Sequence, residues 1–160
     1  MAGYGTDAGF AQWLTDNGLT LPVGAPSAAV LRNRGSAYLD GTYGQRLTCS
    51  YRAGGPEQEL SFPRVGHPNV PADVVPIAWV HASYRAAYLE ATLPGGLSRQ
   101  IDMQRRVQKQ KVDVIERTFF DAGATKPGEA MGLIDAQIDG LVSPYLCSLN
   151  AVLGIRAIGS

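Results

Sequence analysis

Residues 76–93 read PIAWVHASYRAAYLEATL and carry the clearest helical pattern in the chain. Apolar and small side chains recur there at intervals of three and four, at Ile77, Val80, Tyr84, Ala87, Tyr88 and Ala91. These intervals place the side chains on one face of a helix. Pro76 suits the first helical position, and Pro94 with the two glycines after it ends the pattern. A long helix is therefore predicted at the centre of the fold.

Three further helices are predicted on either side of this one. The first, at residues 6–17, begins with a residue suited to an N-cap and stops before a glycine. The second covers residues 27–43. The last covers residues 129–146, although Pro144 should end it near Val142.

Individual positions in these helices carry their own predictions. One face of the second helix holds Leu31, Gly35, Tyr38 and Leu39. Arg32 and Arg34 fall off that face. Gly35 indicates either the close approach of another backbone or a tolerated local weakness. In the last helix, Asp135 and Asp139 are predicted on a solvated face beside the buried stripe.

The remaining segments lack helical periodicity. Residues 44–76 are rich in glycine and proline, and Leu60 and Phe62 are expected to fix this stretch to the core. Residues 112–120 are rich in β-branched and aromatic side chains and predict a strand. Its partner could come from residues 99–110 or from a neighbouring subunit. The predicted fold class is mainly α: a small helical bundle with an extended β-arm or hairpin and an extended C-terminal tail.

Charge and hydropathy restrict the classes of function. The chain has 160 residues, with 14 basic and 14 acidic side chains and a net charge of zero. A protein that neutralises many phosphates needs a positive excess, so this balance argues against nucleic-acid binding as the main task. There is no signal-peptide pattern at the start and no apolar stretch of membrane-spanning length. A soluble protein, intracellular when made, is expected.

The sequence offers no recognisable site for chemistry. Cys49 and Cys147 belong to no Cys-x-x-Cys pair and are expected to be buried free thiols. His67 and His81 do not form a metal pair, and no motif makes either one the partner of a nucleophilic cysteine. Phosphate-binding glycine loops are missing as well. We therefore expect no enzyme, no catalytic residue, no metal site and no cofactor.

One basic stretch stands out electrostatically. It holds Arg99, Arg105, Arg106, Lys109 and Lys111 against a single acid, Asp102. The stretch could be a solvated face or an arm that pairs with an acidic partner surface. It could instead lie near nucleic acid, where such side chains contact the backbone without reading sequence. Aromatic residues beside basic ones, at residues 43–46 and 51–52, could stack on single-stranded bases.

Several short motifs, in their order and spacing, resemble a family of tailed-phage proteins. They are Ala37-Tyr38-Leu39-Asp40, Phe62-Pro63-Arg64, Val75-Pro76 followed by Ala82 and Ala86-Ala87, the extended stretch from Lys111-Val112 to Phe120, Ile138-Asp139-Gly140-Leu141, and Pro144-Tyr145-Leu146. The family comprises adaptor, or head-completion, subunits of head-to-tail connectors, often labelled DnaT-like single-stranded DNA-binding proteins. The resemblance covers most of residues 25–146.

This resemblance implies a structural protein of the virion neck, made in the host cytoplasm. About twelve copies would form a ring beneath the portal. Viral double-stranded DNA would pass through the ring without sequence-specific contacts. The implied partners are the portal protein, stopper or tail-completion proteins and further copies of the chain itself, with no membrane and no cofactor.

The resemblance also assigns roles to segments. Residues 1–146 would form the adaptor domain, with an arm at about 98–121, and residues 147–160 a portal-docking tail. Portal contacts would come from Leu149, Val152, Leu153, Ile155 and Ile158. Contacts between subunits would come from Val112, Val114, Ile115 and Phe119, and the basic residues of the arm would face DNA or a partner. The alternative is a single-stranded DNA-binding replication protein, which should show a basic groove.

Overall fold

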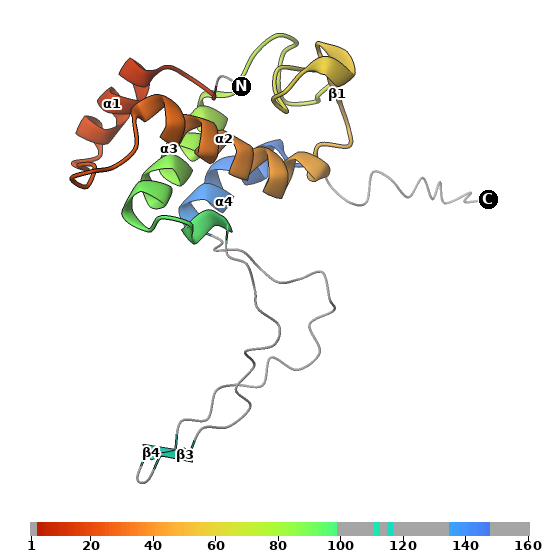
Figure 1. Ribbon diagram of the computed structural model, residues 1–160. Helices are drawn as coiled ribbons and strands as arrows, with labels where there is room; N and C mark the ends of the chain where they lie inside the picture. Colours follow the sequence, from red (N-terminus) through yellow and green to blue (C-terminus); the bar gives the residue numbers. More distant parts are fainter. Residues whose placement is uncertain (1–2, 99–110, 113–114, 117–134, 148–160) are drawn as a thin grey trace.

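The chain forms a small helical body, seen in a computed structural model that describes residues 3–98, 111–112, 115–116 and 135–147 (Figure 1). The helices of the described part are α1 (Asp7–Asp16), α2 (Ala28–Tyr43), α3 (Ile77–Thr92) and α4 (Ala136–Val142). Single 3-10 turns follow at Gly44–Arg46, Gly55–Glu57, Gly96–Ser98 and Ser143–Tyr145. The mainly α fold class with a small hairpin is therefore confirmed. No helix of the described part is long and apolar enough to cross a membrane.

Helix α3 is the central helix, as its pattern predicts. Trp79, Ala82 and Ala86 are fully buried, although the sequence stripe left them out. The buried surface is wider than one stripe because α2 and α4 both pack on α3 and the Phe62 ring meets Trp79 edge-on at 4.9 Å. Ile77, predicted on the stripe, is instead 67% exposed in the first turn of the helix. Burial of this helix starts at Trp79.

Helix α2 crosses α3 at a glycine. A Cβ added at Gly35 would collide with the backbone oxygen of Ser83 and lie 2.8 Å from the backbone nitrogen of Ala87. Of the two explanations for Gly35, close approach of another backbone is therefore confirmed. The two helices can pack this tightly only because this position lacks a side chain.

Arg32 lies off the apolar face of α2 but is not exposed. Its side chain is buried, and Nη1 donates to the backbone oxygens of Gly3, Tyr4 and Gly5. Its Nε donates to Asp7 Oδ1 at 2.7 Å. The arginine thus satisfies the carbonyls of the segment that leads into α1, and this requirement outweighs its position off the apolar face.

The stretch between α2 and α3 contains structure that periodicity does not reveal. Strands β1 (Tyr51–Arg52) and β2 (Arg64–Val65) pair antiparallel, with Tyr51 opposite Val65. Phe62 is buried and Leu60 packs against the core, as predicted. This stretch lies on the opposite side of the body from α1 (Figure 1). Two-residue strands are too short to produce an alternating pattern.

Two predicted elements differ in extent from the observed ones. Helix α4 begins at Ala136, and the predicted residues 129–134 lie outside the described part. Strand β3 (Lys111–Val112) pairs antiparallel with β4 (Ile115–Glu116), with Val112 opposite Ile115. The expected continuous strand over 112–120 was therefore wrong at its start, because β3 and β4 are two short strands that pair with each other.

Candidate functional site

Two groups of contacts stabilise the parts of the helical body that adjoin residues 99–134 and residues 148–160 in sequence. The first, which we call the arm base, consists of Arg85, Glu90, Gly95 and Asp135. The second, which we call the tail base, consists of Cys49, His67, Tyr145 and Cys147. The arm base contains or lies near the described residues that flank the 99–134 stretch in sequence. The tail base includes the described residue that precedes residues 148–160.

At the arm base, Asp135 joins two helices. Its Oδ1 accepts hydrogen bonds from the backbone nitrogens of Gln137 and Ile138, so it caps α4. Its Oδ2 lies 3.2 Å from Nη2 of Arg85 on α3, and the carboxylate is only 13% exposed. The prediction of a solvated Asp135 was wrong, because the N-cap position turns the carboxylate back toward α3.

The other side of the arm base is built on Glu90. Its Oε1 accepts from Arg34 Nη1 at 3.3 Å and from the backbone nitrogen of Gly95 at 3.2 Å. The side chain is 7% exposed. Gly95 has a φ of +75°, a conformation suited to glycine, and it turns the chain out of α3. Arg85 and Glu90 lie little more than one helical turn apart, so both ends of the 99–134 segment are fastened to one region of α3.

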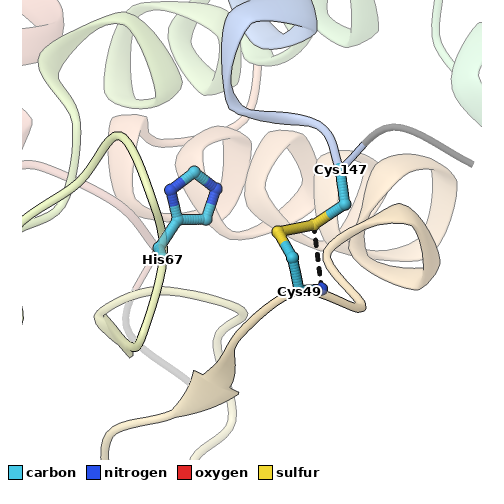
Figure 2. A group of neighbouring side chains, drawn as sticks. All are labelled: Cys49, His67 and Cys147. Carbon is cyan, nitrogen blue, oxygen red and sulfur yellow. Dashed lines mark hydrogen bonds between the residues drawn. A yellow bond between two sulfur atoms is a disulfide. The ribbon is translucent and has the colours of Figure 1, made fainter. Parts of the chain in front are cut away.

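At the tail base, a disulfide joins Cys49 to Cys147, with their Cα atoms 5.7 Å apart (Figure 2). The backbone nitrogen of Cys147 donates to the carbonyl of Arg46 at 3.0 Å. Nε2 of His67 lies 2.8 Å from the carbonyl of Tyr145, and Asn69 Nδ2 donates to the carbonyl of Pro144. These bonds, one of them covalent, thus hold residues 144–147 against the body.

The expectation of free, buried cysteines was wrong. Both cysteines are half-buried, and they are 98 residues apart in the chain. The stretch leading into β1 carries Cys49 alongside the end of α4, a juxtaposition that only the tertiary fold creates. No local motif marks such a pair, so sequence spacing could not have revealed it.

His67 lies beside the disulfide, and one ligand atom from each of Cys49, His67 and Cys147 falls within 4.8 Å of the others (Figure 2). The arrangement does not suit a metal ion. The sulfurs are bonded to each other, and Nδ1 of His67 accepts from the backbone nitrogen of Asn69 at 3.2 Å. A metal-bound histidine usually donates from its second ring nitrogen, so an amide donor at that position is unfavourable.

The described body has a negative charge balance. Residues 3–98 and 135–147 contain six arginines and nine acidic residues, a net charge of −3. Arg32, Arg34 and Arg85 form ion pairs within the body. Arg64 is buried against the carbonyls of residues 47, 50 and 61, and burial lowers its pKa. The described body therefore presents no basic groove.

Of the two positions proposed to stack on bases, residues 43–46 contain a buried tyrosine and residues 51–52 an exposed one. Tyr43 is buried, and burial raises its pKa to about 12. Tyr51 is 79% exposed next to Arg52, which is also exposed. Of the two positions, only the pair at 51–52 is open to a ring from solution.

A shallow pocket between α1, α3 and α4 has a volume of about 360 Å³. It is lined by Gly9, Gln12, Trp13, Asp16, Asn17, His81, Gln137 and Leu141. Its single acid, Asp16, accepts a hydrogen bond from Gln12 Nε2. No arginine or lysine lines this pocket, so it is poorly suited to phosphate.

Most residues predicted to make contacts lie outside the described part. Lys111 and Val112 form β3, and Ile115 belongs to β4. The undescribed residues are Arg99, Arg105, Arg106, Lys109, Val114 and Phe119 of the arm, and Leu149, Val152, Leu153, Ile155 and Ile158 of the tail. Their roles stay predictions.

Comparison with known proteins gives one family. A family model described as "Putative DnaT-like ssDNA binding protein" matches residues 3–154, which include the whole described body. No curated protein and no solved structure shows a significant match to the chain. The description agrees with the label expected from the short motifs and does not mention phage connectors. On this match over nearly its whole length, the chain belongs to the DnaT-like single-stranded DNA-binding family.

Proposed function

We propose that the protein is a structural subunit of a phage head-to-tail connector. Its arm, at about residues 98–121, would join neighbouring subunits, and its tail, at residues 147–160, would bind the portal. The observation that carries this proposal is the reinforcement of the arm base and the tail base. Both segments start from ion pairs, capping bonds or a disulfide rather than from loosely attached loops.

Such anchoring suits segments that bind partners. A segment that holds a neighbour transmits strain to its own body through its point of attachment. A weak attachment would unfold locally before the partner contact separated. The arm base connects the arm to the most buried helix, α3. Contacts of one surface with a different surface of the next copy close into a ring when the rotation permits.

The charge distribution also supports a ring through which DNA passes, rather than a surface that binds DNA tightly. The described body has a net charge of −3, and its arginines are largely engaged in internal contacts. A negative lumen would let DNA slide, because few phosphates would be neutralised. The basic residues of the arm could then contact acidic surfaces of neighbouring bodies.

The test uses matched substitutions in the tail. Leu153→Asp with Ile155→Asp should abolish cosedimentation with purified portal, because charged side chains cannot occupy an apolar docking site. Ser148→Asp with Asn150→Asp adds the same charge at polar positions and should preserve binding. Equal binding by both double variants would show that the apolar tail does not hold the portal.

Single-stranded DNA binding is the second candidate, and the family description favours it over the connector. On this reading, the five basic residues of the 99–111 stretch would contact phosphates, and exposed Tyr51 could stack on a base. Arg105→Glu with Arg106→Glu should then weaken binding of a labelled oligonucleotide and reduce its salt dependence by about one unit of slope per lost contact. Lys126→Glu with Arg156→Glu is the matched control, since neither residue belongs to the basic stretch or to the exposed pair at 51–52.

A further inference from the structure

We propose that Cys49 and Cys147 form a thiol–disulfide exchange site that reacts with small disulfides such as oxidised glutathione, with Cys147 as the attacking thiolate. Both residues are half-buried and lie outside the fully buried core. Their bond joins the stretch before β1 to the residue from which the tail departs (Figure 2). This inference does not depend on which of the two functions is correct.

A hydrogen bond distinguishes the two sulfurs. The backbone nitrogen of Cys49 lies 2.9 Å from Sγ of Cys147 and donates to it (Figure 2). Because the donor is a main-chain N–H, the group itself is retained on reduction and on substitution of the Cys49 side chain. A hydrogen bond to a charged sulfur is stronger than one to a neutral sulfur, so the bond favours the thiolate of Cys147.

His67 helps to hold this site but does not serve as its base. Nδ1 accepts from the backbone nitrogen of Asn69, so the ring proton lies on Nε2, which donates to the carbonyl of Tyr145. The imidazole has no free lone pair for a thiol proton. The proton of Cys147 therefore passes to solvent.

The exchange proceeds in two balanced steps. The Cys147 thiolate attacks one sulfur of a small disulfide, a Cys147–small-thiol bond forms, and the other small thiol leaves and takes a proton from solvent. Cys49 loses its proton to solvent and attacks Cys147 Sγ, so the protein disulfide forms and the second small thiol leaves. Two protein thiols are oxidised, and one small disulfide is reduced to two thiols.

The surrounding contacts let this bond open without releasing the segment. The amide of Cys147 stays bonded to the carbonyl of Arg46, and His67 and Asn69 hold the carbonyls of Tyr145 and Pro144. These contacts keep the reduced sulfurs near each other, so closure competes well with the return of a small thiol. Oxidation fastens the base of the tail, and reduction loosens it.

The direct test compares two single variants of the full chain, each reduced and then mixed with oxidised glutathione. Cys49→Ser retains Cys147 and its main-chain donor, whereas Cys147→Ser leaves only Cys49. Mass spectrometry should show the glutathione adduct forming about tenfold faster on Cys49→Ser than on Cys147→Ser. Equal rates, the reverse order or no adduct on Cys147 would overturn the assignment of the nucleophile.

A second measurement uses the unsubstituted protein and so does not depend on the folding of the variants. Graded ratios of reduced to oxidised glutathione should convert it reversibly between dithiol and disulfide. Hydrogen exchange should then increase on reduction most strongly around residues 46–50 and 144–147. A disulfide that resists millimolar glutathione, or one whose loss unfolds α3, would identify a purely structural crosslink and overturn the proposal.

Discussion

Arg85 and Asp135 lie 3.2 Å apart and connect the middle of α3 to the N-cap of α4. Asp135 is the first described residue after the 117–134 stretch, so this ion pair fixes the point where the chain rejoins the body. One carboxylate therefore starts a helix and docks it. Because α4 has only seven residues, its stability depends on such tertiary contacts rather than on its own length.

Replacing Asp135 with alanine should destabilise the body by about 1–2 kcal/mol, because two amides of α4 lose their acceptor and Arg85 loses its partner. Urea unfolding followed by circular dichroism measures the loss. Asp139→Asn is the control, since Asp139 lies in the same helix without capping it, and it should change stability by about 0.5 kcal/mol or less. Similar losses in the two variants would contradict the role given to Asp135.

Gly35→Ala should destabilise the protein by roughly 1–3 kcal/mol, because the new methyl group collides with the backbone of α3. Gly41→Ala is the matched control in the same helix, since nothing lies within 4 Å of its added Cβ. The control should stabilise the protein by about 0.5–1 kcal/mol through helix propensity. Thermal unfolding of both variants decides the question, and a neutral Gly35→Ala would mean that α2 and α3 are not closely packed.

The helices and Gly35 illustrate what could be predicted from the sequence. The helix periods located α1, α2 and α3 to within a few residues. Gly35 suggested two explanations, of which the close backbone contact is confirmed. Both signals are local, since they depend on residues three or four apart in one helix. Such signals can therefore be recognised without knowledge of the tertiary fold.

The residues whose surroundings the sequence did not reveal all depend on contacts between distant segments. Arg32 is buried because its guanidinium donates hydrogen bonds to the backbone carbonyls of the segment before α1. Asp135 is shielded because α4 docks on Arg85, and Cys49 meets Cys147 across 98 residues. A polar side chain is placed by the partners it satisfies, and those partners cannot be identified from periodicity.

The carboxyl of Asp40 should make stability depend on pH. It accepts from the hydroxyl of Tyr4 and from the backbone nitrogen of Ser61, both at 2.8 Å. Burial nevertheless raises the pKa of this carboxyl above its ordinary value of 3.8, outweighing the hydrogen bonds that lower it. The folded state therefore holds the proton more tightly than the unfolded state. The contribution of Asp40 to stability should decrease as the pH rises from 3.8 through the raised pKa.

Asp40→Asn removes the titrating group and should remove that decrease. The measurement is the free energy of unfolding in urea at a series of pH values, compared between the variant and the original protein. Asp16→Asn, at an exposed site on α1, controls for the general effect of one lost charge. A pH profile for Asp40→Asn that runs parallel to the original would show that Asp40 titrates normally.

The disulfide should also contribute strongly to stability. In the chain-entropy description, a crosslink between residues 98 apart stabilises by up to about 4.7 kcal/mol. The double variant Cys49→Ser with Cys147→Ser should therefore unfold at lower urea concentration. Reducing the unsubstituted protein should lower its stability by the same amount. If the double variant and the oxidised protein were equally stable, the bond would contribute nothing to the fold.

The most direct test of the connector function is electron microscopy of the full chain mixed with the portal of its own phage. We expect rings of about twelve copies stacked on one end of the portal. Monomers that ignore the portal and instead coat single-stranded DNA would contradict the connector and establish the DNA-binding function named in the family description.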